Sequence, residues 1–197
     1  NNVAPEVKAL RKNTITLPAM NVKAVADKKN IIKSKESAFE LQMDVTPGRL
    51  ATTGVELYNA KGEKVKIYFD TKERKLVMDR TESGLVEFGK RSVPHDIEKN
   101  YSDVHQGVGN TPFRVLNSIN YKNDFALGTW APLSLCKGTT YHVDIFVDKC
   151  SVEIFVDGGR IAMTNLVFPT APYTSVKFYN NGASTSFRNI TLSELSL

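Results

Sequence analysis

The sequence predicts an all-β protein of the sandwich or barrel type, on three observations. Short segments in which apolar and polar residues alternate recur along the chain, and turn residues separate them about every ten positions. No window has the residue spacing of a long amphipathic helix. The ten Phe and seven Tyr among the 197 residues also favour strands over a disordered chain.

The clearest prediction is a β-meander within residues 141–169. Apolar residues alternate with polar ones at the period of two that is typical of a half-buried strand, first over 141–147 and again over 152–156. Between these segments, residues 148–151 reverse the chain. Asp157-Gly158-Gly159-Arg160 then supplies residues that tolerate positive φ, as a tight hairpin requires, and residues 161–164 pair back.

The remaining predicted strands are shorter. They cover residues 14–17, 22–25, 39–45, 55–59, 65–69, 76–78, 175–179 and 186–192. Residues 26–35 are polar and predict a loop, and residues 3–11 predict either a short helical turn or an extended linker. Residues 80–135 carry many Gly and Pro. This region is too long for a structureless connection, so it predicts one or two short strands around 113–116 and a surface excursion.

Composition excludes several classes of protein. The net charge of +5 comes from 26 basic and 21 acidic residues that are scattered among one another, which argues against a nucleic-acid-binding surface. No apolar run approaches the roughly 20 residues that a membrane-spanning helix needs. No secretory signal opens the chain, but the chain also lacks an initiator Met and is compatible with a processed or excised piece.

Cysteine and histidine spacing predicts neither a disulfide nor a metal site. Cys136 and Cys150 flank one predicted strand at its opposite ends, beyond the roughly 7 Å Cα separation that a disulfide tolerates, so both are expected as free thiols. His95, His105 and His142 are scattered and lack ligand spacing. We therefore expect no metal and no cofactor.

Three segments resemble the C-terminal part of glycoside hydrolase family 32, which contains invertases, inulinases and levanases. The segment VDKCSVEIFVDGGRIAMTNLVFP matches the family's strand pair and hairpin at Asp148, Ser151, Val152, Glu153, Phe155, Gly159, Thr164, Phe168 and Pro169. Residues 57–84 are similar to its sandwich strands and end in an Asp-Arg-Thr-x-Ser-Gly turn, and residues 5–11 are similar to its interdomain linker. The resemblance weakens between residues 87 and 127.

This resemblance implies a two-sheet antiparallel β-sandwich of the jelly-roll, concanavalin-like type. Residues 1–13 would be the remnant of an interdomain linker, and residues 14–197 a single sandwich domain with an irregular insertion at about 87–127. In the family, a five-bladed propeller in the same polypeptide carries out retaining hydrolysis of fructosyl bonds, with two carboxyl groups about 5 Å apart. The family's Asn-Asp-Pro-Asn, Arg-Asp-Pro and Glu-Cys motifs do not occur in this sequence.

The expected function is therefore that of a non-catalytic module. It would stabilise the propeller of a levanase-, inulinase- or β-fructofuranosidase-type glycosidase and aid substrate or dimer contacts. The resemblance implies an extracellular or periplasmic location and leaves a homodimer open. Two alternatives stand beside it: an independent module that binds fructan or another carbohydrate, and a structural protein-interaction sandwich.

The sequence offers only weak candidates for ligand contacts. Trp130, the single Trp, could stack on a sugar ring or belong to the core or an interface. Tyr101 and His105 in the long irregular region are candidates on the same reasoning, and that region could instead cover a sheet edge. Asp148 and Glu153 could be read as a catalytic carboxylate pair, but a structural role, with Glu153 hydrogen-bonding across strands or to a turn, is the better interpretation.

Overall fold

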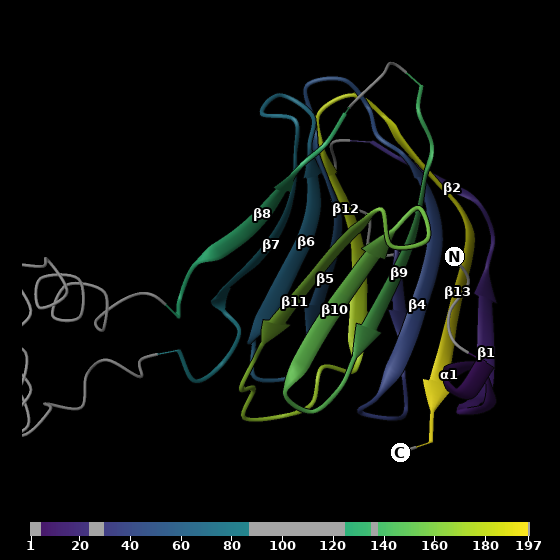
Figure 1. Cartoon of the computed structure of the whole chain (residues 1–197), viewed down its shortest axis with the longest axis vertical. Coiled ribbons are helices and arrows are strands. Elements are labelled where there is room, and N and C mark those ends of the chain that lie inside the picture. The colour runs from purple at the N-terminus through teal and green to yellow at the C-terminus, as the bar shows by residue number, and fades with distance from the viewer. Residues whose placement is uncertain (1–4, 24–29, 87–124, 135–137, 197) are drawn as a thin grey trace, which may run out of the picture.

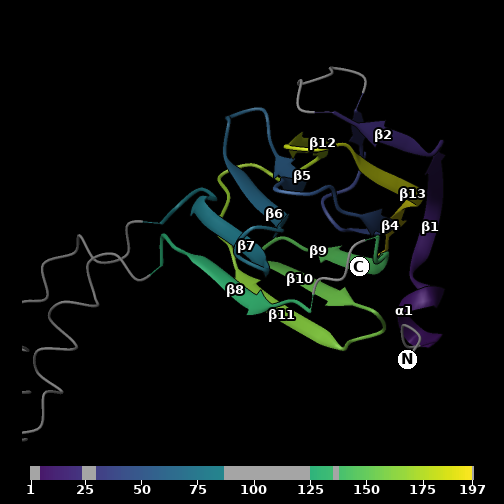
Figure 2. The same cartoon turned by 90° about the horizontal axis from the view of Figure 1, so that it is seen from above.

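The computed structural model describes residues 5–23, 30–86, 125–134 and 138–196. The strands of these residues form two antiparallel sheets that face each other, with the helix α1 (Pro5–Ala9) beside the edge of one sheet (Figures 1 and 2). The predicted two-sheet β-sandwich is confirmed. The predicted strand around 113–116 lies outside the described residues, as does most of the 87–127 insertion.

The seven-stranded sheet contains the first and the last strand of the described chain. Its order is β1-β13-β4-β9-β10-β11, and β2 also pairs with β13. Its strands are β1 (Arg11–Leu17), β2 (Met20–Val22), β4 (Phe39–Thr46), β9 (Tyr141–Val147), β10 (Ser151–Val156), β11 (Ile161–Leu166) and β13 (Thr185–Leu195). The predicted meander is confirmed as β9-β10-β11, and Asp157, Gly158 and Gly159 have positive φ in its hairpin.

The six-stranded sheet has the order β3-β12-β5-β6-β7-β8. Its strands are β3 (Ile31–Lys33), β5 (Thr52–Tyr58), β6 (Lys64–Asp70), β7 (Lys75–Glu82), β8 (Gly128–Pro132) and β12 (Ser175–Asn181). Three of its neighbouring pairs, β5-β6, β6-β7 and β7-β8, join strands that are consecutive in the sequence.

Several predicted boundaries were wrong. Residues 31–33 form β3 within the segment predicted as a loop, because they pair with β12 although three residues are too few to show a period. The strand predicted over 22–25 is β2, which begins earlier, at Met20. Residues 128–132, not predicted as a strand, form β8 by pairing with β7. β1 and β7 are longer than predicted because their ends are polar.

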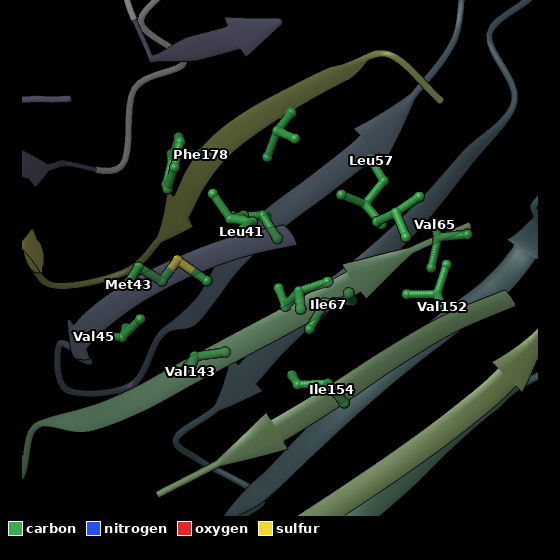
Figure 3. Close-up of a cluster of buried hydrophobic side chains, with 14 of the residues drawn as sticks. Leu41, Met43, Val45, Leu57, Val65, Ile67, Val143, Val152, Ile154 and Phe178 are labelled. Atoms are coloured by element: carbon green, nitrogen blue, oxygen red, sulfur yellow. The ribbon is translucent and has the colours of Figure 1, made fainter. Parts of the chain in front are cut away.

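The core lies between the two sheets and follows the alternation of the strands (Figure 3). Leu41 and Met43 of β4, Val143 of β9 and Ile67 of β6 face one another from the two sheets and are almost fully buried. Burying such side chains contributes about 1.5–3 kcal/mol each. This apolar layer determines which residues of each strand point outward, and so which residues are available for function.

Hydrogen bonds join the two sheets at two ends of the core. The buried Glu194 carboxylate of β13 accepts hydrogen bonds from Asn13 of β1 and from the backbone N–H of Lys35, which follows β3. On the opposite side, the Asn165 amide of β11 donates to the Thr129 hydroxyl of β8, 2.8 Å away. These bonds fix the two sheets relative to each other at both margins.

Candidate functional site

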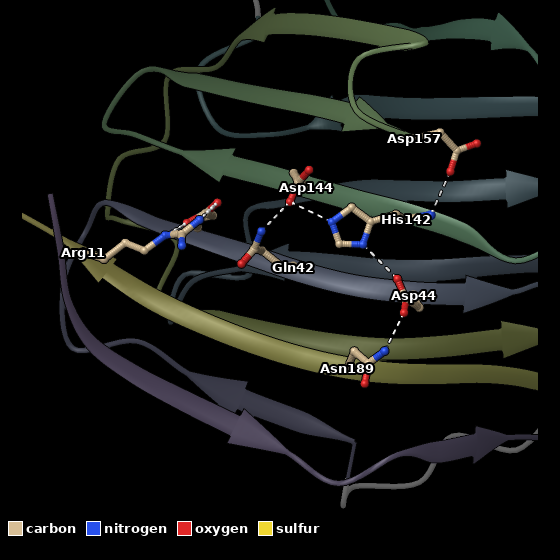
Figure 4. A network of polar contacts seen from close by, with 8 residues as sticks. Arg11, Gln42, Asp44, His142, Asp144, Asp157 and Asn189 are labelled. Carbon is tan, nitrogen blue, oxygen red and sulfur yellow. Dashed lines mark hydrogen bonds and ion pairs between the residues drawn. The ribbon is translucent and has the colours of Figure 1, made fainter. Parts of the chain in front are cut away.

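A polar network covers part of the outer face of the seven-stranded sheet (Figure 4). His142 of β9 lies between two carboxylates, with Nδ1 2.8 Å from Oδ1 of Asp44 and Nε2 3.4 Å from Oδ1 of Asp144. The amide of Gln42 donates to the same oxygen of Asp144 over 2.7 Å, and Asn189 donates to Asp44 over 2.6 Å. Cross-strand register produces the network, because Asp44 stands opposite His142, and Gln42 opposite Asp144.

The carboxylates favour the protonated form of the imidazole. Burial by itself would lower the pKa of His142. The hydrogen bond to Asp44 and the negative charges of Asp144, Asp44 and Asp157 outweigh burial and raise this pKa above its usual value. Asp157 also accepts a hydrogen bond from the backbone N–H of His142. The network therefore favours the imidazolium form of a half-exposed ring.

A second charged contact on the same face involves Arg11 at the start of β1. Its guanidinium binds Glu40 of β4 through both carboxylate oxygens, with Nε 2.5 Å from Oε2 and Nη2 2.7 Å from Oε1. This hydrogen bond is the main reason why the pKa of Arg11 is raised. Since Glu40 is 0% exposed, the pair anchors the first strand over the sheet.

These carboxylates do not form a hydrolytic site. A retaining glycosidase needs an acid and a nucleophile that line a substrate pocket, whereas Asp44 and Asp144 stand on a sheet face and are bonded to Asn189, Gln42 and the imidazole. Within the described residues, no group of three or more His, Cys, Asp and Glu side chains is arranged to hold a metal ion.

The carboxylate pair that the sequence suggested is not assembled either. Asp148 follows β9 and accepts a hydrogen bond from the N–H of Lys149 in its own turn. Glu153 is in the middle of β10, opposite Phe146 and Thr164 on the outer face. Its carboxylate forms no hydrogen bond with any other described residue, so the expected bond across the strands or to a turn is not observed. Its position on an open sheet face still agrees with a structural role.

The candidate contact residues have different outcomes. Trp130 lies in the middle of β8, on the outer face of the six-stranded sheet, and is 56% exposed, so it does not belong to the core. The ammonium of Lys75 is 4.5 Å from the centre of its ring. Tyr101 and His105 lie outside the described residues. Cys150 is an exposed free thiol, as predicted, whereas Cys136 lies outside the described residues.

A shallow depression of about 400 Å³ lies between the end of β8 and the β10–β11 hairpin. Among the residues that the structure describes, its charged lining groups are Asp157 and Arg160, and Asp157 already binds the backbone of His142. It is lined by Ala131, Pro132, Leu133, Ser134, Tyr141, Val156, Asp157, Arg160, Ile161 and Ala162. The depression therefore presents few groups that could perform chemistry.

Sequence reasoning missed the contacts that organise both outer faces. It did not pair Arg11 with Glu40 or His142 with Asp44, because 29 and 98 residues separate these partners. For the six-stranded sheet the sequence did carry one signal. Tyr68 and Tyr179 stand at positions of their strands that alternate with the buried residues, so their aromatic rings could have been placed on the outer face. Taken together, the fold and these contacts define a β-sandwich domain whose described charged groups mainly serve its own architecture.

Comparison with known proteins agrees with this class. The family model described as "Glycosyl hydrolases family 32 C terminal" matches residues 6–194, almost the whole chain. The chain belongs to this family. The resemblance seen in the sequence is thereby confirmed.

Curated relatives are longer enzymes. The chain is 30% identical over 95 residues to a levanbiose-producing levanase of Bacillus subtilis, a match that covers 48% of the chain and 17% of the relative. It is 23% identical over 181 residues to a levanase of a Bacillus species, covering 90% of the chain and 16% of the relative. A sucrose-6-phosphate hydrolase of Staphylococcus xylosus is 27% identical over 139 residues, covering 71% and 21%. The chain thus spans about a fifth or less of these relatives.

Solved structures support the fold. A β-fructofuranosidase of Aspergillus kawachii superimposes with a TM-score of 0.64 at 16% identity, over 98% of this chain and 29% of that one. An exo-inulinase of Aspergillus awamori superimposes with a TM-score of 0.62 at 16% identity, over 96% and 31%. At these identities the likeness establishes the sandwich fold alone.

Proposed function

We propose that this chain is the non-catalytic C-terminal sandwich of a larger enzyme that hydrolyses fructosyl linkages, and that it stabilises the catalytic domain by packing against it. One observation carries the proposal: the match to a C-terminal family over residues 6–194, in relatives named levanases that are several times longer. The reacting groups would belong to a catalytic propeller in the same polypeptide.

The arrangement of charges supports a supporting role. The carboxylates on the outer face of the seven-stranded sheet are already bound by Arg11, Gln42, His142 and Asn189. Side chains that are held in this way keep a surface in one shape, and they stand on a sheet face instead of lining a substrate pocket. Such a face suits contact with another folded domain.

The start of the described chain indicates how the two domains would be joined. Because the matching family is a C-terminal one, the catalytic domain would precede α1, which lies beside β1 at the edge of the seven-stranded sheet (Figure 2). The Arg11–Glu40 pair holds the first residue of β1 against β4. It would therefore set the direction in which the chain leaves the sandwich toward its partner.

The test compares the parent polypeptide with a version truncated before the sandwich. We expect the truncated enzyme to melt at a lower temperature and to lose activity on heating sooner, since the packed face of the catalytic domain would be exposed to water. The 197-residue chain alone should not hydrolyse sucrose, inulin or levan. Robust turnover by this chain would overturn the proposal, and so would equal thermal stability of the two enzymes.

Two finer expectations belong to the same proposal. Export to the extracellular or periplasmic space follows from the family resemblance and is checked by fractionating cells that produce the parent polypeptide. Homodimerisation through the sandwich is checked by light scattering of the parent and of the truncated enzyme.

Among the described helices, none is long and apolar enough to cross a membrane.

A further inference from the structure

Three aromatic side chains stand in one line across the outer face of the six-stranded sheet. Along this line Tyr179 of β12 is opposite Gly54 of β5, Gly54 is opposite Tyr68 of β6, Tyr68 is opposite Val77 of β7, and Val77 is opposite Trp130 of β8. In β5, β6, β7 and β12 the neighbours of these residues include buried core residues, and Trp130 is opposite Val77, so all five face outward. We call Tyr179, Tyr68 and Trp130 the aromatic row.

The rings are spaced by the sheet itself. Strands lie about 4.8 Å apart, so residues two strands apart in the same register are separated by about 9.5 Å. The centroids of Tyr68 and Tyr179 are only 6.5 Å apart, with 61° between the ring planes, because Gly54 between them has no side chain. The row therefore combines one edge-to-face pair of rings with a third ring, that of Trp130, at the edge of the sheet.

Charged groups flank the row on both sides. On one side stand Asp70 and Lys75, a cross-strand pair that lies two residues from Tyr68 in β6 and from Val77 in β7. The ammonium of Lys75 is 4.5 Å from the centre of the Trp130 ring. On the other side, cross-strand pairing places four charged residues in a line: Lys177, Glu56, Lys66 and Asp79. Nζ of Lys177 is 3.7 Å from Oε2 of Glu56. Three lysines thus balance three carboxylates around the row.

The fold accounts for only part of this arrangement. Tyr68 and Tyr179 stand on either side of Gly54, which is buried although it is on the outer face. Such covering of a glycine by cross-strand rings stabilises a sheet. Trp130 has no comparable role, because more than half of its surface is exposed. A large exposed ring that continues a line of aromatic residues is characteristic of a contact surface.

The hydroxyl groups of the row are hydrogen-bond donors at neutral pH. Burial raises the pKa of Tyr179, and the nearby Tyr68, Glu56 and Asp79 raise it further. Burial also raises the pKa of Tyr68, together with the charges of Asp79 and Asp70. The line therefore offers aromatic faces and neutral hydroxyls between rims of charged groups that can donate or accept hydrogen bonds.

We propose that the aromatic row is a binding platform for a neutral oligosaccharide chain that lies across the strands. The C–H-bearing faces of sugar rings stack on aromatic rings, and their hydroxyl groups bond with carboxylates and ammonium groups such as those on both rims. The balanced charge of the rims argues against an anionic polymer, which would require an excess of Lys and Arg. Contact with a sugar would also use the exposed surface of Trp130.

The single Trp of the chain makes the test direct, because the tryptophan fluorescence of this protein reports on the row alone. The 197-residue chain is titrated with levan and inulin oligosaccharides, and with a linear glucan as a second neutral chain. We expect at least one of these sugars to shift the Trp130 emission and to protect the indole from quenching by acrylamide. Calorimetry gives the affinity independently.

Variants then locate the site. Trp130→Ala and Tyr68→Ala should each weaken binding about tenfold or more, the loss expected for one stacking contact. Trp130→Phe keeps an aromatic ring and should retain part of the affinity. Phe155→Ala is the matched control, because Phe155 is an aromatic residue on the outer face of the other sheet; this variant should bind as the wild type does. Circular dichroism confirms that each variant is folded.

Absence of binding to all three sugars would overturn the proposal, as would binding that Trp130→Ala and Tyr68→Ala leave unchanged. These outcomes are independent of the proposed role in supporting a catalytic domain. Loss of thermal stability in the truncated parent enzyme tests that role whether or not the aromatic row binds sugar.

Discussion

Arg11 and Glu40 form a bidentate ion pair that fastens the first strand of the sandwich to its centre. Both nitrogen–oxygen contacts are short, at 2.5 and 2.7 Å, and Glu40 is fully buried while the Arg11 side chain is 24% exposed. A carboxylate in this environment depends on its partner, because removal of the guanidinium leaves a charge away from water.

Arg11→Met should therefore lower the free energy of unfolding by about 3 kcal/mol, the usual cost of removing one partner from a buried pair. Urea unfolding measures the loss. Lys64→Met is the matched control, because the side chain of its partner Glu82 is 55% exposed and stays solvated when the ion pair is lost, so the loss should cost less than about 1 kcal/mol. Equal losses in the two variants would contradict the anchoring role of Arg11.

His142 should make stability depend on pH. Its pKa is raised in the folded protein, so the stabilisation from its charge is complete below the unfolded pKa of about 6.5 and is lost as the pH rises through the folded pKa. The stability advantage of the wild type over His142→Gln should therefore be larger at about pH 5.5 than at about pH 8.5. Urea unfolding at the two pH values measures it.

The cause of this shift can be tested separately by an NMR titration of the imidazole. Asp44→Asn removes the charge that is hydrogen-bonded to Nδ1, so the pKa of His142 should fall toward or below its ordinary value. Glu153→Gln is the control, because Glu153 is not among the charges that shift this pKa. A wild-type pKa at or below about 6.5 would refute the assignment.

Gly54 should be intolerant of any side chain. A Cβ at this position would be 2.0 Å from the carbonyl oxygen of Ile67 in the neighbouring strand. Gly54→Ala should therefore destabilise the protein by roughly 1–3 kcal/mol, the range for overpacking, as measured by thermal or urea unfolding. In Gly128→Ala the nearest atom, on Val77, is 3.5 Å away, and this control should be close to neutral. A neutral Gly54→Ala would show that β5 and β6 separate easily.

Tyr173 should contribute to stability through its hydroxyl group. The ring is buried, and the hydroxyl donates a hydrogen bond to the backbone carbonyl of Ser83 in the turn after β7. Tyr173→Phe should cost about 1–2 kcal/mol, because the buried carbonyl loses its donor. The control is Tyr58→Phe, since the Tyr58 hydroxyl has no hydrogen bond to another described residue. Equal unfolding free energies of the two variants would contradict the prediction.

Local patterns were sufficient for much of the fold. The alternation in residues 141–147 and 152–156 predicted both strands and the direction in which their apolar residues point, and the Gly pair at 158–159 predicted the hairpin. Strands without such a pattern were missed. β3 has three residues and β8 is interrupted by small residues and Pro, so their pairing with β12 and β7 identifies them as strands.

Amino-acid order by itself determined the class of fold, the inward face of the long strands and the family resemblance, because these depend on a period of two and on residues close together in the chain. Tertiary structure decided which outward residues meet. Three arrangements require the register of strands that are distant in sequence. They are the pairing of Arg11 with Glu40, the position of His142 between Asp44 and Asp144, and the alignment of Tyr179, Tyr68 and Trp130. Alternation sets the face of a sheet on which a side chain lies, but only the packing of the whole core selects its neighbour.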